Sequence, residues 1–261
     1  MNCISTKNLN ISYGNLDIVK DLNLDIPKGK ITTIIGSNGC GKSTILKTIA
    51  RIIQPKSGDI YVNDKNMKEQ NPKDLAKTMA VLPQSPTAPS GLTVEELIAY
   101  GRFPHQKGFG KLKNEDKDIV TWALKSTGIE EFRDRTMEAL SGGQRQRAWI
   151  AMALAQQTNI LILDEPTTYL DLAHQLEVLK LLEELNRKQG TTIVMVIHEL
   201  NNAARFADHM IGVKKGEVVC QGSAYEVMTK ENLRELFNID AEIVSDPRTK
   251  KPVCITYDMA I

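Results

Sequence analysis

Residues 36–44 read GSNGCGKST and match the pattern GxxxxGK[ST] of a phosphate-binding loop. The apolar run ITTII at 31–35 precedes this loop, and the helix-forming stretch LKTIARII follows it. Glycine lets the backbone wrap tightly with its N–H groups turned inward, and a helix N-terminus adds positive potential. We expect Lys42 to contact the β- and γ-phosphates of a nucleotide and Ser43 to bind Mg²⁺. The phosphate loop, whose residues are all expected to bind nucleotide, comprises Gly36, Ser37, Asn38, Gly39, Cys40, Gly41, Lys42, Ser43 and Thr44.

A second acidic motif, ILILDE at 160–165, follows a buried-strand pattern. Asp164 at the end of that strand is placed to hold Mg²⁺ through its hydration shell. Glu165 then points elsewhere and is suited to orient or deprotonate an attacking water. The alternative is that two acids merely end a strand at the surface, and the presence of a phosphate loop in the same chain weakens it.

The runs NILIL at 159–163 and TTIVMVI at 191–197 are continuous and apolar, as strands covered on both faces tend to be. Between them, residues 171–189 have helical spacing, with an apolar stripe of Leu172, Leu176, Leu179 and Leu182. Strand, helix and strand in this order predict a parallel α/β sheet.

Two further regions depart from this parallel pattern. Residues 18–26 alternate, with Leu22, Leu24 and Ile26 on one face, which predicts a strand in an antiparallel β piece near 1–30 and 58–63. Residues 92–156 show helical patterns without a convincing strand and predict a helical insert.

Three segments outside the core patterns complete the outline. Residues 102–114, RFPHQKGFGKLKN, are expected to form an exposed basic loop. The tail at 223–261 is expected to start as helix and to end in an extended, proline-containing segment. We expect one domain over 1–261, with a core and β subdomain at 1–84 and 157–222, a helical subdomain at about 85–156 and a C-terminal extension from 223.

Residues 140–144 read LSGGQ, and with this signature segment the chain resembles the ATP-binding cassette family over nearly its whole length. The resemblance implies that Tyr13 stacks on adenine, that Gln84 touches Mg²⁺ and water, and that His198 is a switch histidine acting in catalysis with Glu165. It also implies a P-loop ATPase fold with an antiparallel β subdomain and an inserted α-helical subdomain. The segment Tyr169–Leu170–Asp171 corresponds to the D-loop of that family.

The signature segment also has a physical interpretation, because a good helix former, RQRAWIAMALA, follows it. Backbone amides and a hydroxyl at a helix start form a second anion site. The family resemblance implies that this site binds the γ-phosphate of ATP held by a second copy, so that two chains enclose two ATP molecules. The implied cofactors are ATP and Mg²⁺, with Ser43, Gln84 and Asp164 near the metal. Nucleotide-binding residues are further expected at Ser141, Gly142, Gly143, Gln144 and Asp171.

Two groups of His and acidic residues resemble metal sites. His198–Glu199 begins like the zinc-protease motif HExxH, but position 202 is Asn, which excludes that motif. Asp171, His174 and Glu177 lie near one helix face and could hold a metal. An exposed helix face that starts with an acidic residue is the favoured interpretation.

Composition limits the class of protein. The 261 residues carry 33 Lys and Arg against 32 Asp and Glu, and this net charge of +1 argues against binding nucleic acid through bulk electrostatics. No apolar run reaches 18 residues, and the N-terminus shows no secretory signal. The four scattered cysteines, Cys3, Cys40, Cys220 and Cys254, indicate reduced thiols in the cytosol.

Similarity at GLTVEELIAYGRFPH (91–105), EPTTYLD (165–171) and DPRTKKPVCITY (246–257) points to importers of iron–siderophores, haem or vitamin B12. The resemblance implies a homodimer of this chain, two separate membrane permease subunits and, indirectly, an extracytoplasmic substrate-binding protein. It places the chain on the cytoplasmic face of the membrane. An exporter ATPase and a soluble ATP switch without transport remain open at this point.

Overall fold

The computed structural model describes residues 1–106 and 112–260. Its contacts form two compact units, Met1–Gln70 with Asn186–Ile261 and Asn71–Leu185. The expected C-terminal extension belongs to the first unit, and the expected helical segment of about 85–156 lies within the second. The finer division into core and subdomains stays a prediction.

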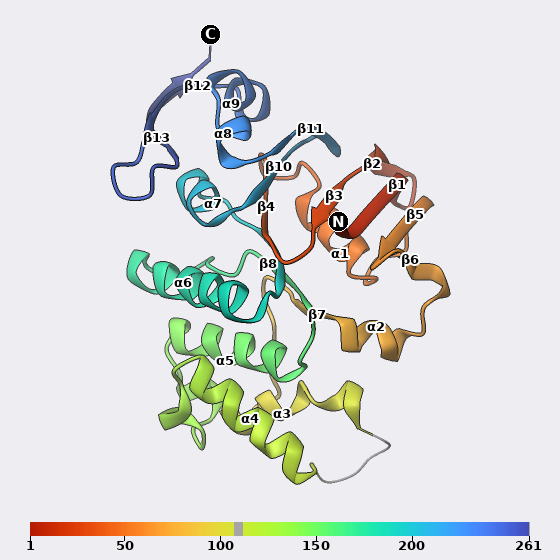
Figure 1. The fold of residues 1–261 in the computed structure, drawn as a ribbon, viewed down its shortest axis with the longest axis vertical. Coiled ribbons are helices and arrows are strands. Elements are labelled where there is room, and N and C mark those ends of the chain that lie inside the picture. The colour runs from red at the N-terminus through yellow and green to blue at the C-terminus, as the bar shows by residue number, and fades with distance from the viewer. Residues whose placement is uncertain (107–111, 261) are drawn as a thin grey trace. The chain divides into compact units, whose positions relative to one another are not determined.

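An antiparallel sheet opens the first unit (Figure 1). Its central strand β1 (Asn2–Tyr13) pairs with β2 (Leu16–Leu22), β3 (Asp25–Pro27) and β5 (Ser57–Val62), and β5 pairs with β6 (Lys65–Asn66). The predicted antiparallel β piece is therefore confirmed.

The predicted strand at 18–26 is wrong in one respect, because it is broken into two. Leu22, Leu24 and Ile26 are buried as the alternation requires. Between them, the Asn23 side chain accepts a hydrogen bond from the Asn8 N–H at 3.0 Å and donates one to the Asp21 carbonyl at 2.8 Å. These local bonds compete with a continuous strand ladder.

Parallel strands form the second sheet of this unit. β4 (Ile31–Ile35) lies between β9 (Thr192–Val196) and β10 (His209–Lys214) and is parallel to both. β11 (Glu217–Gly222) adds an antiparallel edge. Every residue of β4 and β9 is buried, which explains why neither strand contains a charged residue. α1 (Lys42–Ile49) follows β4, and α7 (Leu200–Phe206) follows β9.

The tail contains α8 (Ala224–Val227), α9 (Lys230–Phe237), β12 (Ile239–Ser245) and β13 (Pro252–Met259). The expected helical start and extended end are both present. Beyond the expectation, β12 and β13 pair as an antiparallel hairpin. The Asn201 side chain on α7 accepts from the Cys254 N–H and donates to the Cys254 carbonyl, both at 2.9 Å, and so joins α7 to β13.

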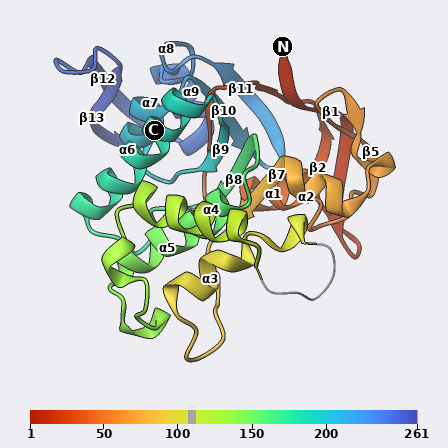
Figure 2. The same cartoon turned by 60° about the horizontal axis from the view of Figure 1, so that its bottom comes forward.

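The second unit combines a parallel strand pair with helices. β7 (Met79–Leu82) and β8 (Ile160–Asp164) run parallel. Figure 2 shows α3 (Val94–Tyr100), α4 (Asn114–Ser126) and α5 (Gly142–Ala155) side by side, and each contacts the other two. Among the described residues of 92–156, the only β contact is an isolated bridge from Thr93 to Thr136, so the predicted helical character is confirmed. The helices of the unit are α2 (Pro72–Thr78), α3 (Val94–Tyr100), α4 (Asn114–Ser126), α5 (Gly142–Ala155) and α6, which runs over Leu172–Gln189.

Short 3₁₀ turns connect these elements. They are η1 (Met67–Glu69), η2 (Phe103–His105), η3 (Glu130–Phe132) and η4 (Met137–Ala139).

Two expectations for the helical part are wrong. Arg102 does not belong to an exposed loop, because it is buried in an ion pair with Asp116 at 2.8 Å. Residues 107–111 of that predicted loop lie outside the described residues. Leu172 is 77% exposed, so the buried stripe of α6 starts one to two turns later than its leucine spacing indicates. Its members are Val178, Leu179, Leu182 and Leu185.

No helix in the described part of the chain is both long and apolar enough to cross a membrane. The four cysteines are all unpaired, and three of them are buried.

Candidate functional site

The phosphate loop connects β4 to α1 in the first unit, as the sequence predicts. Gly36, Gly39 and Gly41 all have positive φ, the conformation that glycine tolerates best. At Gly36 a Cβ would lie only 2.1 Å from the Val213 carbonyl oxygen, so the loop also needs glycine to pass β10.

The loop wraps around its own lysine. Lys42 is 5% exposed, and its Nζ donates to the carbonyl oxygens of Gly36 and Ser37, each at 2.9 Å. Ser37, Asn38 and Gly39 form the exposed tip. The first turn of α1 carries no acidic side chain to compete for its free N–H groups. The arrangement is a cationic, amide-lined cradle suited to phosphate.

Two more predicted residues lie in this unit. Tyr13 ends β1 and is 50% exposed, which leaves its ring accessible for stacking. His198 follows β9 and is exposed at the start of the segment leading into α7.

The second unit brings together two residues that the sequence assigned separately. Gln84 follows β7, and Glu165 follows β8. The Gln84 Nε2 donates to Glu165 Oε2 at 2.5 Å, and the Thr168 hydroxyl donates to the same oxygen at 3.0 Å. The sequence does contain a signal for this contact, because the carboxyl ends of parallel neighbouring strands meet at one edge of a sheet.

Asp164 and Glu165 are adjacent but differ in their surroundings. Asp164 is 2% exposed at the end of β8. Glu165 has a φ of 53°, which turns the chain sharply at that point. That the two carboxylates point in different directions stays a prediction.

The signature segment forms the start of α5, as expected. Ser141 caps the helix: its hydroxyl accepts from the Gln144 N–H at 3.3 Å, and the Gln144 side chain accepts from the Ser141 N–H at 3.0 Å. No acidic residue lies in the first turn. The remaining free amides of this turn form a site suited to an anion.

Asp171 directly precedes α6 and accepts hydrogen bonds from the His174 N–H at 2.9 Å and from His174 Nδ1 at 2.8 Å. The bond from the His174 backbone N–H, and after it the bond from the His174 side chain, hold the pKa of the Asp171 carboxyl below its usual range. In the part of the chain that the structure describes, no group of three acidic, His or Cys side chains is placed to hold a metal ion. The exposed-face interpretation of Asp171, His174 and Glu177 stays a prediction.

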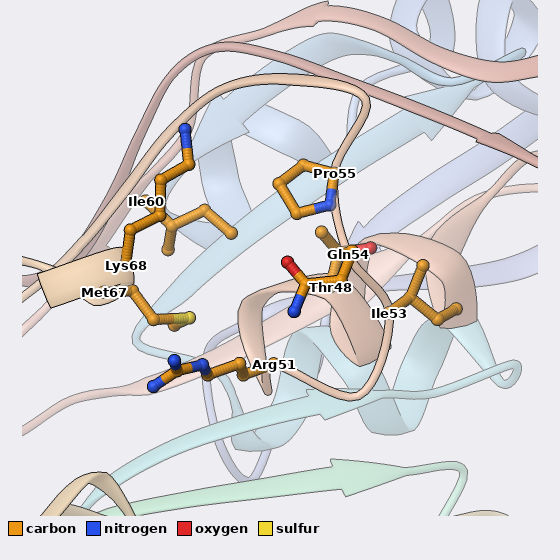
Figure 3. A pocket seen from close by; sticks show the side chains of 8 residues that line it. All are labelled: Thr48, Arg51, Ile53, Gln54, Pro55, Ile60, Met67 and Lys68. Carbon is orange, nitrogen blue, oxygen red and sulfur yellow. The ribbon is translucent and has the colours of Figure 1, made fainter. Parts of the chain in front are cut away.

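A small cavity of about 150 Å³ lies near the C-terminal end of α1 (Figure 3). It is distinct from the phosphate loop, which precedes the N-terminal end of the same helix. Thr48 and Arg51 line it together with Ile60, Met67 and Lys68 from β5 and η1. None of the predicted site residues lines it.

The fold and these motifs define an α/β nucleotide-binding protein with a phosphate loop and a second, amide-lined anion site. Comparison with protein families narrows the class, since the family described as ABC transporter matches residues 19–168.

Curated relatives cover almost the whole chain. The iron(3+)-hydroxamate import ATP-binding protein FhuC of Bacillus subtilis (strain 168) is 64% identical over 99% of this chain and 96% of its own length. The ferric enterobactin transport ATP-binding protein FepC of Escherichia coli (strain K12) is 43% identical over 95% of this chain and 91% of its own.

Solved structures agree. An inward-facing metal-chelate type ABC transporter matches with a TM-score of 0.84 at 31% identity, over 97% of this chain and 96% of that one. A post-hydrolysis dimer of the cassette MJ0796 bound to ADP and Pi matches with a TM-score of 0.74 at 31% identity, over 84% of this chain and 98% of that one. The chain belongs to the ABC transporter family, in which it is an ATP-binding subunit with the fold of the family's ATPases.

Proposed function

We propose that this chain is the ATP-hydrolysing motor of an importer of ferric hydroxamates, energising a separate permease by ATP-driven closure of a homodimer. The observation that carries the proposal is the 64% identity, over 99% of the chain, to a protein named for iron(3+)-hydroxamate import. A relative named for siderophore transport supports the broader class, as do relatives named for achromobactin and ferric enterobactin transport.

The roles of the site residues in this proposal follow from their chemistry. Lys42 and the loop amides bind the ATP phosphates, and Tyr13 stacks on the adenine. The amides of Gly142 and Gly143 bind the γ-phosphate of ATP held by the second copy, with Ser141, Gln144 and Asp171 beside them. Glu165 is the base for the attacking water, Gln84 orients Glu165 and the water, and His198 contacts the γ-phosphate.

The donor set in this chain fits Mg²⁺. Ser43, Gln84 and Asp164 offer a hydroxyl, an amide and a carboxylate oxygen, the hard ligands that Mg²⁺ prefers. When bound, the ion would offset the negative charge of the phosphates.

Two permease subunits bind a dimer of this chain at the cytoplasmic face of the membrane, and an extracytoplasmic binding protein delivers the substrate. The iron chelate itself does not touch this chain.

The test uses the Glu165→Gln variant, which should bind ATP and trap the closed dimer. We would capture it with ATP and Mg²⁺ from its native membranes and identify the bound proteins. The expected partner is a permease with about ten predicted spans per subunit, each span needing about 20 apolar residues. A six-span partner would instead indicate an exporter, and recovery without any membrane protein would leave a soluble ATP switch.

A further inference from the structure

One face of α6 carries Asp171, His174 and Glu177, and the proposed ATPase mechanism uses only the first of them. The structure shows where the other two side chains go. Glu177 accepts a hydrogen bond from Arg147 of α5, with Glu177 Oε2 2.5 Å from Arg147 Nη2. His174 lies one turn closer to the signature segment, against Gly143.

The contact between His174 and Gly143 leaves no room for a side chain on Gly143. A Cβ on Gly143 would lie 2.5 Å from His174 Cδ2, 3.0 Å from Cγ and 3.3 Å from Nε2. Gly143 is helical and has no positive φ, so its backbone conformation does not itself require glycine. Within this chain, the imidazole ring is therefore what a side chain at this position would meet.

The ring is held in place from its other side. His174 Nδ1 is 2.8 Å from Asp171 Oδ1, and that carboxylate also accepts from the His174 backbone N–H. A rotation of the ring away from Gly143 would break the Nδ1 bond. Asp171, His174 and Gly143 thus form one continuous series of contacts from the D-loop to the first turn of α5.

Gly142 provides a comparison within the same turn. A Cβ there would meet only Leu170 Cδ2 at 3.7 Å, an ordinary van der Waals distance. The tight approach is thus specific to Gly143 and does not extend to every glycine of the signature segment.

We propose that His174 is a positioning residue for ATP hydrolysis: it fixes the first turn of the signature helix against the D-loop, so that the amides of Gly142 and Gly143 and the Asp171 carboxylate move as one body when the dimer closes. The inference rests on the proposed function, because it assigns those amides to the γ-phosphate of the second copy. His174 itself does not touch nucleotide in this account.

The test is a double-mutant cycle of Gly143→Ala and His174→Ala, with ATP hydrolysis measured on the assembled transporter. In the wild-type background we expect Gly143→Ala to lower kcat about tenfold, and in the His174→Ala background less than about threefold, since residues in contact couple measurably. An equal fold-loss in both backgrounds would overturn the proposal. Gly142→Ala is the matched control, and its effect should be the same with and without His174.

A second measurement separates positioning from a merely structural role. His174→Ala should lower kcat while the KM for ATP stays within about twofold, because ATP first binds the phosphate loop and positioning acts at closure. His174→Asn keeps a donor for Asp171 Oδ1 and should retain a higher kcat than His174→Ala. A wild-type kcat in His174→Ala would overturn the proposal. This measurement does not depend on whether Gly143→Ala assembles.

The two proposals fail differently. A wild-type complex that does not hydrolyse ATP would contradict the proposed function. An active wild-type complex in which Gly143 and His174 are uncoupled sinks only this inference.

Discussion

Arg102 and Asp116 form an ion pair that is almost fully enclosed, with side chains 6% and 11% exposed. The guanidinium also donates to the Ala155 carbonyl at 2.8 Å and to Gln157 Oε1 at 3.0 Å. Burial by itself would raise the pKa of Asp116, but the hydrogen bond and charge of Arg102 outweigh it and hold that pKa below its usual range.

Replacing Arg102 by Met should therefore be costly, because it leaves a buried carboxylate without its cation. We expect a loss of about 3–5 kcal/mol in the free energy of unfolding near neutral pH, measured by urea denaturation. Lys20→Met is the matched control, because Lys20 is 64% exposed and its pair with Asp17 spans 3.9 Å. That change should cost less than about 1 kcal/mol.

The pH dependence of this difference follows from the lowered pKa. The stabilisation from Asp116 is complete above the unfolded-state pKa of about 3.9 and is lost as the pH falls through the folded-state value below it. The difference in the free energy of unfolding between wild type and Arg102→Met should therefore become smaller at acid pH. A difference in unfolding free energy that stays constant from pH 7 to pH 3 would contradict this explanation.

At the residue scale, motif positions could be predicted and long-range partners could not. Lys42 and Ser141 occupy the predicted loop and helix start, because the chemistry of those positions is local. Arg102 was misassigned to an exposed loop, because its partner is 14 residues away and charged residues are usually exposed. The hydrogen bond from Gln84 to Glu165 joins residues 81 apart, so no local pattern encodes it. Its only signal in the sequence is that both residues follow predicted strands whose carboxyl ends meet at one edge of a sheet.

At the scale of elements, the Asn201 side chain joins α7 to β13. Asn201 makes two hydrogen bonds to the Cys254 backbone, and α7 begins two residues after His198. The same end of α7 and the tail hairpin line a cavity of about 520 Å³, which includes His198, Phe237 and Tyr257. The tail is thus attached beside the segment that contains His198.

Asn201→Ala should loosen the tail hairpin without unfolding the first unit. Loss of two neutral hydrogen bonds predicts about 1–3 kcal/mol less protection for amides of β12 and β13, measured by hydrogen exchange. Asn201→Asp keeps the acceptor for the Cys254 N–H and should have a smaller effect. Unchanged protection in both variants would mean that the Asn201 hydrogen bonds do not hold the hairpin.

Elements differ in how well the sequence predicts them. The buried runs at β4, β8 and β9 were predicted, because strands covered on both faces are continuously apolar. The break between β2 and β3 was missed, since it depends on hydrogen bonds of the Asn23 side chain rather than on the apolar pattern. The exposed Leu172 shows that helical spacing alone does not say where burial starts.

At the scale of the whole molecule, the predicted site residues fall in both compact units. The phosphate loop, Tyr13 and His198 belong to the first, and the remaining predicted residues belong to the second. Two solved structures similar to this chain, both of the cassette MJ0796, are dimers, and one of them is bound to ADP and Pi. The transported compound is inferred from similarity to named relatives alone.

The central claim is that ATP hydrolysis dependent on Glu165 drives ferric hydroxamate import. The direct measurement is uptake of radiolabelled ferric hydroxamate by cells that lack this chain and carry either the wild type or Glu165→Gln. Wild type should restore uptake, and Glu165→Gln should leave it at background, because loss of a general base lowers turnover by about 10²–10⁴-fold. Equal uptake with both forms would contradict the account.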